Sequence, residues 1–427
     1  MNDRITLSRR GFLAGTTVIG GAALLSACVG TGGAAGGGGA SGALTLQSSL
    51  SDPAPKAALA SVVKSYKGKV TLNTVAIEQF RAQLSTYLTS SAPPDVLTWY
   101  AGSVANDYAS KDLLLDVSDL WKSGGACANF PPALKALSTA ASGKQIFVPT
   151  NYYWWGIFHK KSAFAEWGIT QPKTWDEFLA VCDKLKSKGI SPLTMGTGST
   201  PWVASGWFDY LDLRVNGATF HRELLAGKHS FDSTEVRNVM KHYAEILPFI
   251  DPNAPSYSWQ EAVTPLVQNK SAMYLIGAFV TQSVPTEQVD DIDFFSVPTI
   301  DSSIPSAEEA PTDGYFASAK TGNKKGTLDL LAYLAAPKTQ QDFIATSKSS
   351  NLPTSPDVNT SGFSPLVQKG VKLLAETKEI TQFFNRDSSD ALQTTADTAL
   401  TKFMAQPGDV SSILKDWQTA AEKVWKA

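Results

Sequence analysis

The chain has 427 residues, of which 43% are hydrophobic, and its formal net charge at pH 7 is −2. A chain of this length and apolar content can bury a large core and is long enough for two domains. The slightly acidic balance and the lack of a basic patch in the sequence argue against nucleic acid as a partner.

The first 28 residues have the pattern of an export signal that ends in a lipidated cysteine. Three arginines among the first ten residues precede an uncharged stretch, 11–27, and small residues surround Cys28. A positive start, a short apolar core and a small-residue exit are the parts of a secretory signal. The stretch 8–13 resembles the twin-arginine export motif, and 25–28 resembles a bacterial lipobox. We therefore expect a signal peptide over 1–27, lipidation of Cys28, and a membrane-anchored location outside the cytoplasm.

Residues 28–43 have the composition of a lipidated cysteine followed by a flexible tether. Residues 29–43 contain eight glycines and no charge, so they cannot bury enough apolar surface to fold. A coil of this length reaches about 20 Å. The alternative to a cleaved signal is an uncleaved membrane anchor, for which the 17-residue stretch 11–27 is short. We expect the tether to hold the rest of the chain near the membrane while letting it turn.

The remainder of the chain alternates between strand and helix patterns. Apolar patterning predicts strands at 44–46, 70–75, 95–99, 145–149, 272–275 and 294–297. It predicts helices at 55–66, 79–90, 174–188, 235–247, 326–334, 339–346, 366–376, 391–404 and 410–425. The helix at 174–188 opens on Thr174 and Glu177, which have capping-box spacing. This alternation predicts α/β layers with helices on both faces of the sheets.

Residues that would mark an enzyme or a metal site are not grouped in this sequence. The four histidines form no metal-binding motif, and neither a nucleophile elbow nor a phosphate-binding loop occurs. Cys127 and Cys182 could pair in an oxidising compartment or remain two buried thiols. We expect no metal and no cofactor. A glycosidase needs just two well-placed carboxylates, so this class of enzyme stays open.

Aromatic residues gather at the ends of the predicted elements and in loops. They occur at 99–100, 152–155, 202, 207, 259, 279, 315 and 383–384. A sugar presents an apolar C–H face to an aromatic ring and hydroxyls to polar groups, and a buried hydroxyl without a partner is costly. Core packing explains each ring alone at least as well as ligand contact does. The set as a whole favours a carbohydrate cleft.

Five short stretches along the chain carry a family resemblance. They are Pro94-Asp95-Val96 with Trp99, the run from Val148 to Phe178, Gly189–Leu193, Ala272–Phe279 and Leu352-Pro353-Thr354. In this order they resemble the family 1 extracellular solute-binding proteins of bacterial ABC importers, chiefly the sugar binders. The lipid anchor and tether fit this resemblance, because such proteins act beside a membrane permease. The family commonly has Trp where this chain has Phe279, which we expect to tune the choice of ligand.

The resemblance implies a two-lobed, periplasmic-binding-protein-like α/β fold of type II, with the ligand held between the lobes. Hinge segments are expected near 147–150 and near 296–300. Lobe 1 would comprise 44–148 and 298–350, and lobe 2 would comprise 149–297 and 351–427. Pro149 and Pro298 suit these crossings, because a proline limits local backbone freedom.

The resemblance also places ligand contacts residue by residue. Trp99 matches the cleft aromatic that follows the Pro-Asp strand, and Phe279 matches the ring of the second lobe that stacks on sugar. Strand alternation lets only one of Tyr152 and Tyr153 face the cleft. The full set of candidate ligand contacts is Trp99, Tyr100, Tyr152, Tyr153, Trp154, Trp202, Trp207, Phe279, Asp313, Tyr315, Asn385, Arg386, Asp387 and Gln79.

Two of these assignments depend on local context. Trp202 and Trp207 are placed in a glycine-flanked loop that supplies contacts in the family. Arg386 and Asp387 are candidates for pairing with sugar hydroxyls, and a surface ion pair between them is an equal alternative.

These features predict a lipid-anchored, monomeric, non-catalytic binding protein that delivers a mono- to short oligosaccharide to the transmembrane subunits of an ABC permease. Its lobes would close around the ligand, because the ligand binds the closed state better. One alternative is an exported carbohydrate-active hydrolase or lyase. Another is a binding protein that signals to a membrane sensor. A non-sugar solute stays open as well, because one fold serves many functions.

Overall fold

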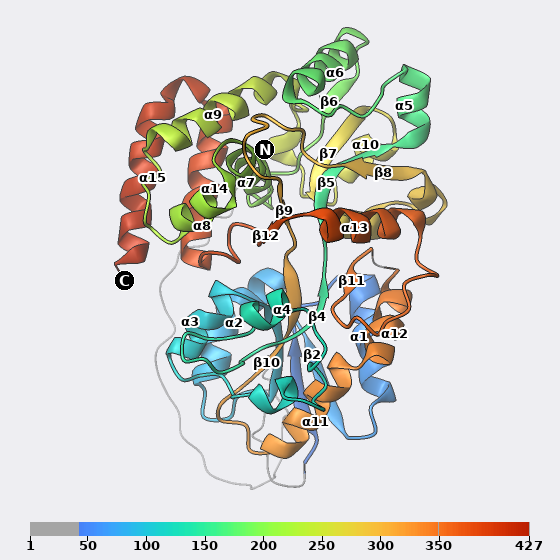
Figure 1. The fold of residues 1–427 in the computed structure, drawn as a ribbon, viewed down its shortest axis with the longest axis vertical. Helices are drawn as coiled ribbons and strands as arrows, with labels where there is room; N and C mark the ends of the chain where they lie inside the picture. The colour runs from blue at the N-terminus through green and yellow to red at the C-terminus, as the bar shows by residue number, and fades with distance from the viewer. Residues whose placement is uncertain (1–41, 349, 427) are drawn as a thin grey trace, which may run out of the picture. The chain divides into compact units, whose positions relative to one another are not determined.

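The computed structural model describes residues 42–348 and 350–426. The predicted signal peptide, Cys28 and the tether up to residue 41 lie outside the described residues. The strands are β1 (Leu44–Ser48), β2 (Val70–Thr74), β3 (Val96–Tyr100), β4 (Val148–Tyr152), β5 (Trp155–Lys160), β6 (Ser191–Leu193), β7 (Ser271–Gly277), β8 (Ile292–Phe295), β9 (Ala307–Glu309), β10 (Thr312–Ala317), β11 (Leu352–Pro353) and β12 (Glu379–Thr381) (Figure 1).

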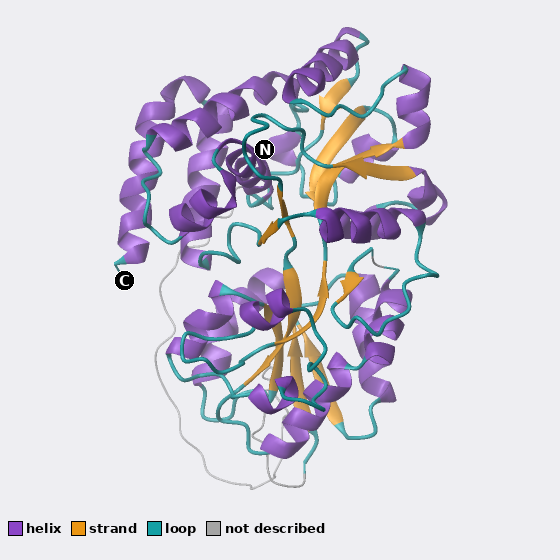
Figure 2. Ribbon diagram, in the orientation of Figure 1, coloured by secondary structure: helices purple, strands orange, loops and turns teal. Residues whose placement is uncertain are grey.

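Helices alternate with these strands along most of the chain (Figure 2). They are α1 (Pro53–Ser65), α2 (Ile77–Thr89), α3 (Ser103–Ser110), α4 (Pro132–Leu137), α5 (Lys161–Trp167), α6 (Trp175–Ser187), α7 (Val203–Val215), α8 (Gly217–Leu225), α9 (Thr234–Ile246), α10 (Val263–Val267), α11 (Lys324–Ala335), α12 (Pro337–Ser347), α13 (Pro365–Glu376), α14 (Asp390–Ala405) and α15 (Val410–Trp425).

The strands sort into two α/β bodies. In the described part of the chain, the first body holds a six-stranded sheet in the order β11-β4-β10-β3-β1-β2, and the second holds a four-stranded sheet in the order β6-β7-β5-β8. In the first sheet β1 runs parallel to both β2 and β3, and β10 returns antiparallel between β3 and β4. The third sheet within 42–348 and 350–426 is a short parallel pair of β9 with β12.

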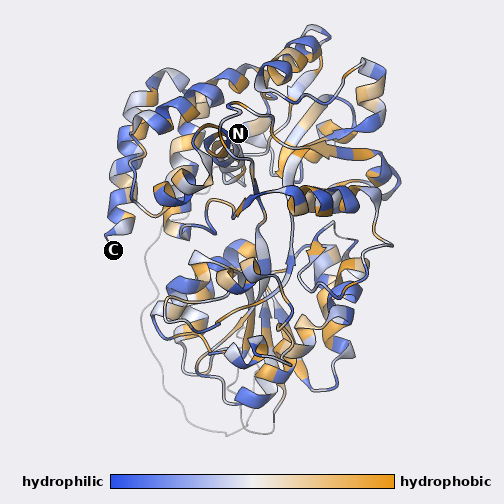
Figure 3. Cartoon of the chain, in the orientation of Figure 1, coloured by the Kyte–Doolittle hydropathy of each residue, from blue (hydrophilic) through white to orange (hydrophobic). Residues whose placement is uncertain are grey.

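The sheet of the first body is covered by helices on both faces. Along β3, Val96 packs into an apolar core with α1, α11 and α12. Leu97 and Trp99 pack into a separate core with α2 and α3. Because successive strand residues tend to point to opposite faces, the two cores lie on the two sides of the sheet. The helices carry hydrophobic and hydrophilic residues side by side, which fits elements with one covered face (Figure 3).

Local sequence signals place most of these elements correctly. The predicted capping box is confirmed: the Thr174 hydroxyl accepts the Glu177 N–H, and the Glu177 carboxylate accepts the Thr174 N–H. Of the helices predicted on periodicity, those at 55–66 and 410–425 correspond to α1 and α15. The strand predicted at 145–149 is shifted, because β4 begins at Val148 and its pairing with β10 and β11 continues to Tyr152.

One predicted loop is a buried helix. The segment after Pro192, expected to be a glycine-flanked loop, contains α7, in which every residue from Val203 to Arg214 is buried. Because α7 has no solvent-facing side, its sequence shows no amphipathic period from which a helix could be recognised. No helix among the described residues is long and apolar enough to cross a membrane.

The chain passes between the two bodies where β4 leads into β5, where β9 leads into β10 and where β11 leads into α13 (Figure 1). The hinge expected at 296–300 is therefore displaced. The Thr299 N–H donates to the Lys173 carbonyl, and the Trp175 N–H donates to the Thr299 carbonyl, so this segment stays beside α6 of the second body. Residues 149–152 and 352–353, expected in lobe 2, pair instead with the first sheet.

Candidate functional site

A cavity of about 520 Å³ lies between the two bodies. Its first-body side is formed at the carboxyl ends of β1 and β3, together with β10 and the start of α2. Its second-body side is formed by Trp155, by the loops around Trp202 and Trp259, by Phe279 and by the segment 383–386. A volume of this size, with apolar walls and a few convergent polar groups, is typical of small-molecule sites.

The second-body wall is a cluster of aromatic rings. The rings of Trp155 and Phe383 stack with centroids 4.9 Å apart and planes 13° apart. Trp202 stands edge-on to Phe383 at 5.8 Å, and Trp259 stands edge-on to Phe279 at 5.0 Å. Trp202, Trp259 and Phe279 are half-buried, so part of each ring is open to the cavity. Together these rings offer several flat apolar faces to a bound molecule.

The first-body wall includes Trp99, whose ring is packed between two other aromatic rings. Trp99 and Tyr100 end β3, and their rings stack at 4.6 Å. Phe80 of α2 stacks on the other side of Trp99 at 5.5 Å. The helix therefore fixes the orientation of the Trp99 ring.

Arg386 forms the centre of the polar part of the site. Its Nη1 donates to Asp313 Oδ1 at 2.7 Å, and its Nη2 donates to the Tyr153 hydroxyl at 2.9 Å. Its guanidinium lies 3.8 Å from the ring centroid of Tyr100. Burial lowers the pKa of Arg386, but Asp313 and the tyrosines raise it, and the net shift is upward. Arg386 is therefore a fixed cation whose remaining N–H groups can donate to a ligand.

Two indole N–H groups at the cavity lack an acceptor. Trp99 Nε1 and Trp155 Nε1 are buried and have no hydrogen-bond partner among the described residues. Both residues line the cavity. A buried donor without a partner is costly.

The structure brings many of the candidate contacts together at this cavity. Trp99, Tyr100, Tyr153, Trp202, Phe279, Asp313, Tyr315, Asn385 and Arg386 line it. Of the two tyrosines between which strand alternation could not decide, Tyr153 faces the cavity and Tyr152 does not. The alternative ion pair of Arg386 with Asp387 does not form, because Arg386 pairs with Asp313 and the Asp387 carboxylate accepts the Gln382 N–H at 2.9 Å.

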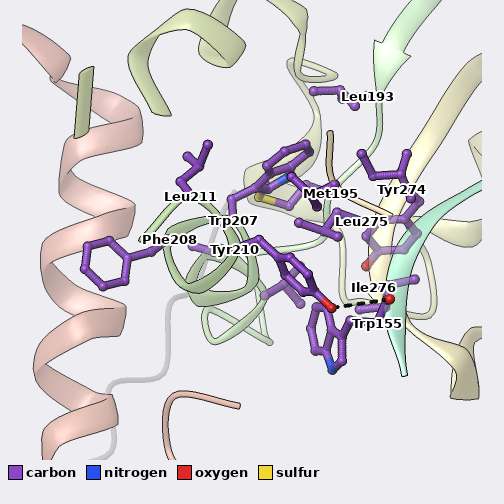
Figure 4. Packing of buried hydrophobic residues seen from close by; sticks show 14 of the residues in the cluster. Trp155, Leu193, Met195, Trp207, Phe208, Tyr210, Leu211, Tyr274, Leu275 and Ile276 are labelled. Atoms are coloured by element: carbon purple, nitrogen blue, oxygen red, sulfur yellow. Dashed lines mark hydrogen bonds between the residues drawn. The ribbon is translucent and has the colours of Figure 1, made fainter. Parts of the chain in front are cut away.

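Three further candidates also lie away from the cavity. The Trp154 ring packs on Phe294 at 5.3 Å, inside the second body. Trp207 lies within α7 and packs among core residues (Figure 4). Gln79 is exposed on α2, and its neighbour Glu78 lines the cavity instead.

Sequence reasoning omitted several residues that the cavity contains. Trp155, Trp259 and Phe383 belong to the aromatic positions noted in the sequence but were not chosen as contacts. Their position at the ends of elements was the available signal. Arg81 also lines the cavity, and its Nε lies 3.4 Å from Asp390 Oδ1.

The two cysteines and the possible metal ligands were the remaining candidates for chemistry. Cys127 and Cys182 are both free and buried, so the two thiols do not form a disulfide. No group of three or more His, Cys, Asp or Glu side chains within 42–348 and 350–426 is placed to hold a metal ion.

Comparisons with known sequences agree with this arrangement. Residues 45–341 match the family of bacterial extracellular solute-binding proteins. An ABC transporter extracellular-binding protein of Pyrococcus horikoshii is 22% identical over 304 residues, which cover 70% of this chain and 67% of that protein. A Rhizobium meliloti protein named "Probable sugar-binding periplasmic protein" is 24% identical over 280 residues, which cover 63% of this chain and 64% of that protein.

Solved structures are similar over most of the chain. The bacterial solute receptor AcbH, described as having an exclusive substrate preference for β-D-galactopyranose, superposes with a TM-score of 0.86 at 27% identity, over 90% of this chain and 100% of that one. A chitin oligosaccharide binding protein superposes with a TM-score of 0.82 at 21% identity, over 91% of this chain and 100% of that one, which concerns the fold alone. The two bodies are thus the lobes of a periplasmic-binding-protein-like fold. The chain belongs to the bacterial extracellular solute-binding protein family.

Proposed function

We propose that the protein captures a small carbohydrate, from a mono- to a short oligosaccharide, in the cavity between its two bodies. The observation that carries this proposal is the combination of several ring faces on one wall with charged side chains at the same cavity, among them Arg81, Asp313 and Arg386. Rings suit the C–H faces of a sugar, and charged and polar side chains can pair with its hydroxyls. The sugar-binding name of the Rhizobium relative and the galactose preference of AcbH support the same class of ligand.

The proposed partner of the loaded protein is the permease of an ABC importer. The matched proteins are named as binding proteins of ABC transporters or as solute receptors, so this protein is a binding protein and not an enzyme. We place the hinges at the β4–β5, β9–β10 and β11–α13 crossings, where the chain leaves one body for the other. Ligand would shift the equilibrium toward the closed state, whose surface docks on the permease.

The sequence around Cys28 supports a lipid anchor for this proposed role. A lipidated cysteine followed by a glycine-rich tether would keep a monomeric receptor close to its permease. Signalling to a membrane sensor is the alternative output of the same binding event.

The proposal is tested by thermal unfolding of the chain from residue 44 against a panel of mono- and oligosaccharides, with D-galactose as the first member. A ligand at a thousand times its Kd adds about 4 kcal/mol of stability and raises the unfolding midpoint clearly. A shift with one sugar, lost in a Trp259→Ala variant, supports the proposal. A flat panel would refute the carbohydrate assignment and direct the search to other solutes.

A further inference from the structure

Behind the cavity wall at 382–387, the second body buries a cluster of ionisable side chains that ligand binding as proposed does not use. Asp209 lies on α7, and His221 lies on α8. Their carboxylate neighbours are Asp212 on α7 and Glu308 with Glu309 on β9. All five side chains belong to residues no more than 1% exposed. Buried charges are costly unless they are paired, so each of these groups needs a partner.

Two of the four carboxylates have a cation of their own. Arg214 Nη2 donates to Glu308 Oε1 at 2.6 Å. His221 Nδ1 lies 2.9 Å from Asp212 Oδ2. Burial lowers the pKa of His221, but the hydrogen bond to Asp212 raises it, and the net shift is upward.

Asp209 and Glu309 form the other pair. His221 Nε2 lies 4.0 Å from Asp209 Oδ1, which is too far for a hydrogen bond. Their carboxyl groups lie close enough to interact with each other. No donor from elsewhere in the described chain reaches either Glu309 oxygen or Asp209 Oδ1. Two carboxyl groups can share a hydrogen bond only when one of them carries a proton. Burial and the neighbouring Asp209 charge raise the pKa of Glu309 well above its ordinary value, and burial raises the pKa of Asp209 to about 7. The pair therefore keeps at least one proton near neutral pH.

The second oxygen of Asp209 supports the cavity wall. Asp209 Oδ2 accepts the Phe384 N–H at 2.8 Å, within the buried interior. Phe383 and Arg386, on either side of Phe384, line the cavity. The same wall segment is joined to the first body, where the Thr312 N–H donates to the side chain of Gln382 at 3.0 Å. The wall is therefore anchored in both bodies, and Asp209 provides its bond to α7.

Glu309 is linked to the ring wall by a second route. Its backbone N–H donates to the Tyr210 hydroxyl at 3.3 Å, and that hydroxyl donates to the Trp155 carbonyl at 3.4 Å (Figure 4). Movement of β9 away from α7 would thus disturb Trp155 as well as the wall segment.

We propose that Asp209 is a positioning residue for the carbohydrate site, and that one proton shared with Glu309 keeps it there. The shared proton removes the repulsion between the two buried carboxylates. Asp209 Oδ2 can then accept the Phe384 N–H, which fixes Phe383 and Arg386 at the cavity. The effect on ligand rests on the proposed function, because positioning matters to a sugar only if the cavity binds one.

Other titratable and charged side chains face this pair from several helices and strands. They are Tyr210 and Asp212 on α7, His221 on α8, Tyr243 on α9, Glu308 on β9 with its partner Arg214, and Asp387 on the wall segment, near Arg222. All of them are kept in a Glu309→Gln variant. The difference between that variant and the wild type therefore isolates the proton of the pair.

The proton is tested without ligand, by urea unfolding of the purified full-length protein and its Glu309→Gln variant between pH 5.5 and 7.5. The amide side chain of this variant can donate to Asp209 but has no proton to lose. Folded wild type keeps a proton that unfolded Glu309 releases above its ordinary pKa of 4.5. Its unfolding constant should therefore rise at least about tenfold more steeply per pH unit than that of the variant. Equal slopes would overturn the proposal.

If the variant does not fold, infrared spectroscopy of the wild type decides: a protonated carboxyl band at pH 7 supports the shared proton, and its absence overturns it.

The positioning role is tested by hydrogen exchange and ligand affinity in an Asp209→Ala variant. The peptide covering 380–387 should exchange at least about tenfold faster than in the wild type, because the Phe384 N–H loses its acceptor. Affinity for D-galactose, or for the panel sugar that binds, should fall at least about tenfold. Asp293→Asn is the matched control, since Asp293 also accepts a backbone N–H, from Phe294, but lies away from the cavity. Unchanged exchange in Asp209→Ala, or an equal effect of the control, would overturn the role. If no sugar binds, the proposed function fails, whereas the unfolding and exchange data still decide the proton pair.

Discussion

Replacing Arg386 by methionine should destabilise the protein strongly at neutral pH, because it leaves Asp313 without its cation. The side chains of Arg386 and Asp313 are 8% and 23% exposed, so their ion pair is largely shielded from water. Breaking a buried pair by removing one partner costs about 3–5 kcal/mol, and the partial exposure of Asp313 places the expected loss near about 3 kcal/mol. Methionine keeps most of the volume of the side chain, so packing contributes little to this loss.

The pH dependence of this loss follows from the buried carboxylate that remains. Burial already raises the pKa of Asp313 against the opposing effect of Arg386, and removal of Arg386 raises it further. The folded variant then binds a proton more tightly than the unfolded chain does. Its deficit should therefore be small near pH 4 and should grow as the pH rises toward 7.

Urea unfolding at pH 4 and pH 7 measures both quantities. The double variant Arg386→Met with Asp313→Asn removes the unpaired charge and should recover most of the stability at pH 7. Arg222→Met is the matched control, because Arg222 pairs with Glu379 at 2.7 Å but the two side chains are 43% and 35% exposed. An exposed pair contributes about 1 kcal/mol or less. A loss below about 1 kcal/mol in Arg386→Met, or a double variant as unstable as the single one, would refute this reasoning.

Three further outcomes separate the site from the core. Trp259→Ala should weaken sugar binding at least about tenfold in calorimetry. Trp207→Ala, in the core of the second body, should instead cost about 3–5 kcal/mol of stability. The reverse result would contradict the assignment of Trp259 to the site and Trp207 to the core. Burial lowers the pKa of His159 to about 4, so up to about 3 kcal/mol of stability should be lost as the pH falls from 6.5 to 4, but not in His159→Phe. Burial raises the pKa of Cys127 to about 12 and also raises that of Cys182, so neither should react with a thiol reagent until urea unfolds the protein.

The sequence by itself determined the α/β architecture and most element positions. Capping at Thr174 and the apolar stripe of α1 are local signals, because a helix repeats its buried face every three to four residues. Five short stretches in order along the chain were enough for the family, whose model matches residues 45–341. Clustering of aromatic residues near turns indicated an aromatic wall, and Trp99 and Phe279, which the resemblance assigns to the ligand cleft, line the cavity.

Only the tertiary structure decided which of the neighbouring aromatic and charged residues face the cavity. Trp154 and Trp155 are adjacent in sequence, yet one packs inside the second body and the other lines the cavity. The pairing of Arg386 with Asp313 joins residues 73 positions apart, and the contact of Asp209 with Phe384 joins residues 175 apart. Local periodicity reports which side of an element is covered, but not by what. The partner of a buried charge is set by the packing of distant elements, and no pattern along the chain records it.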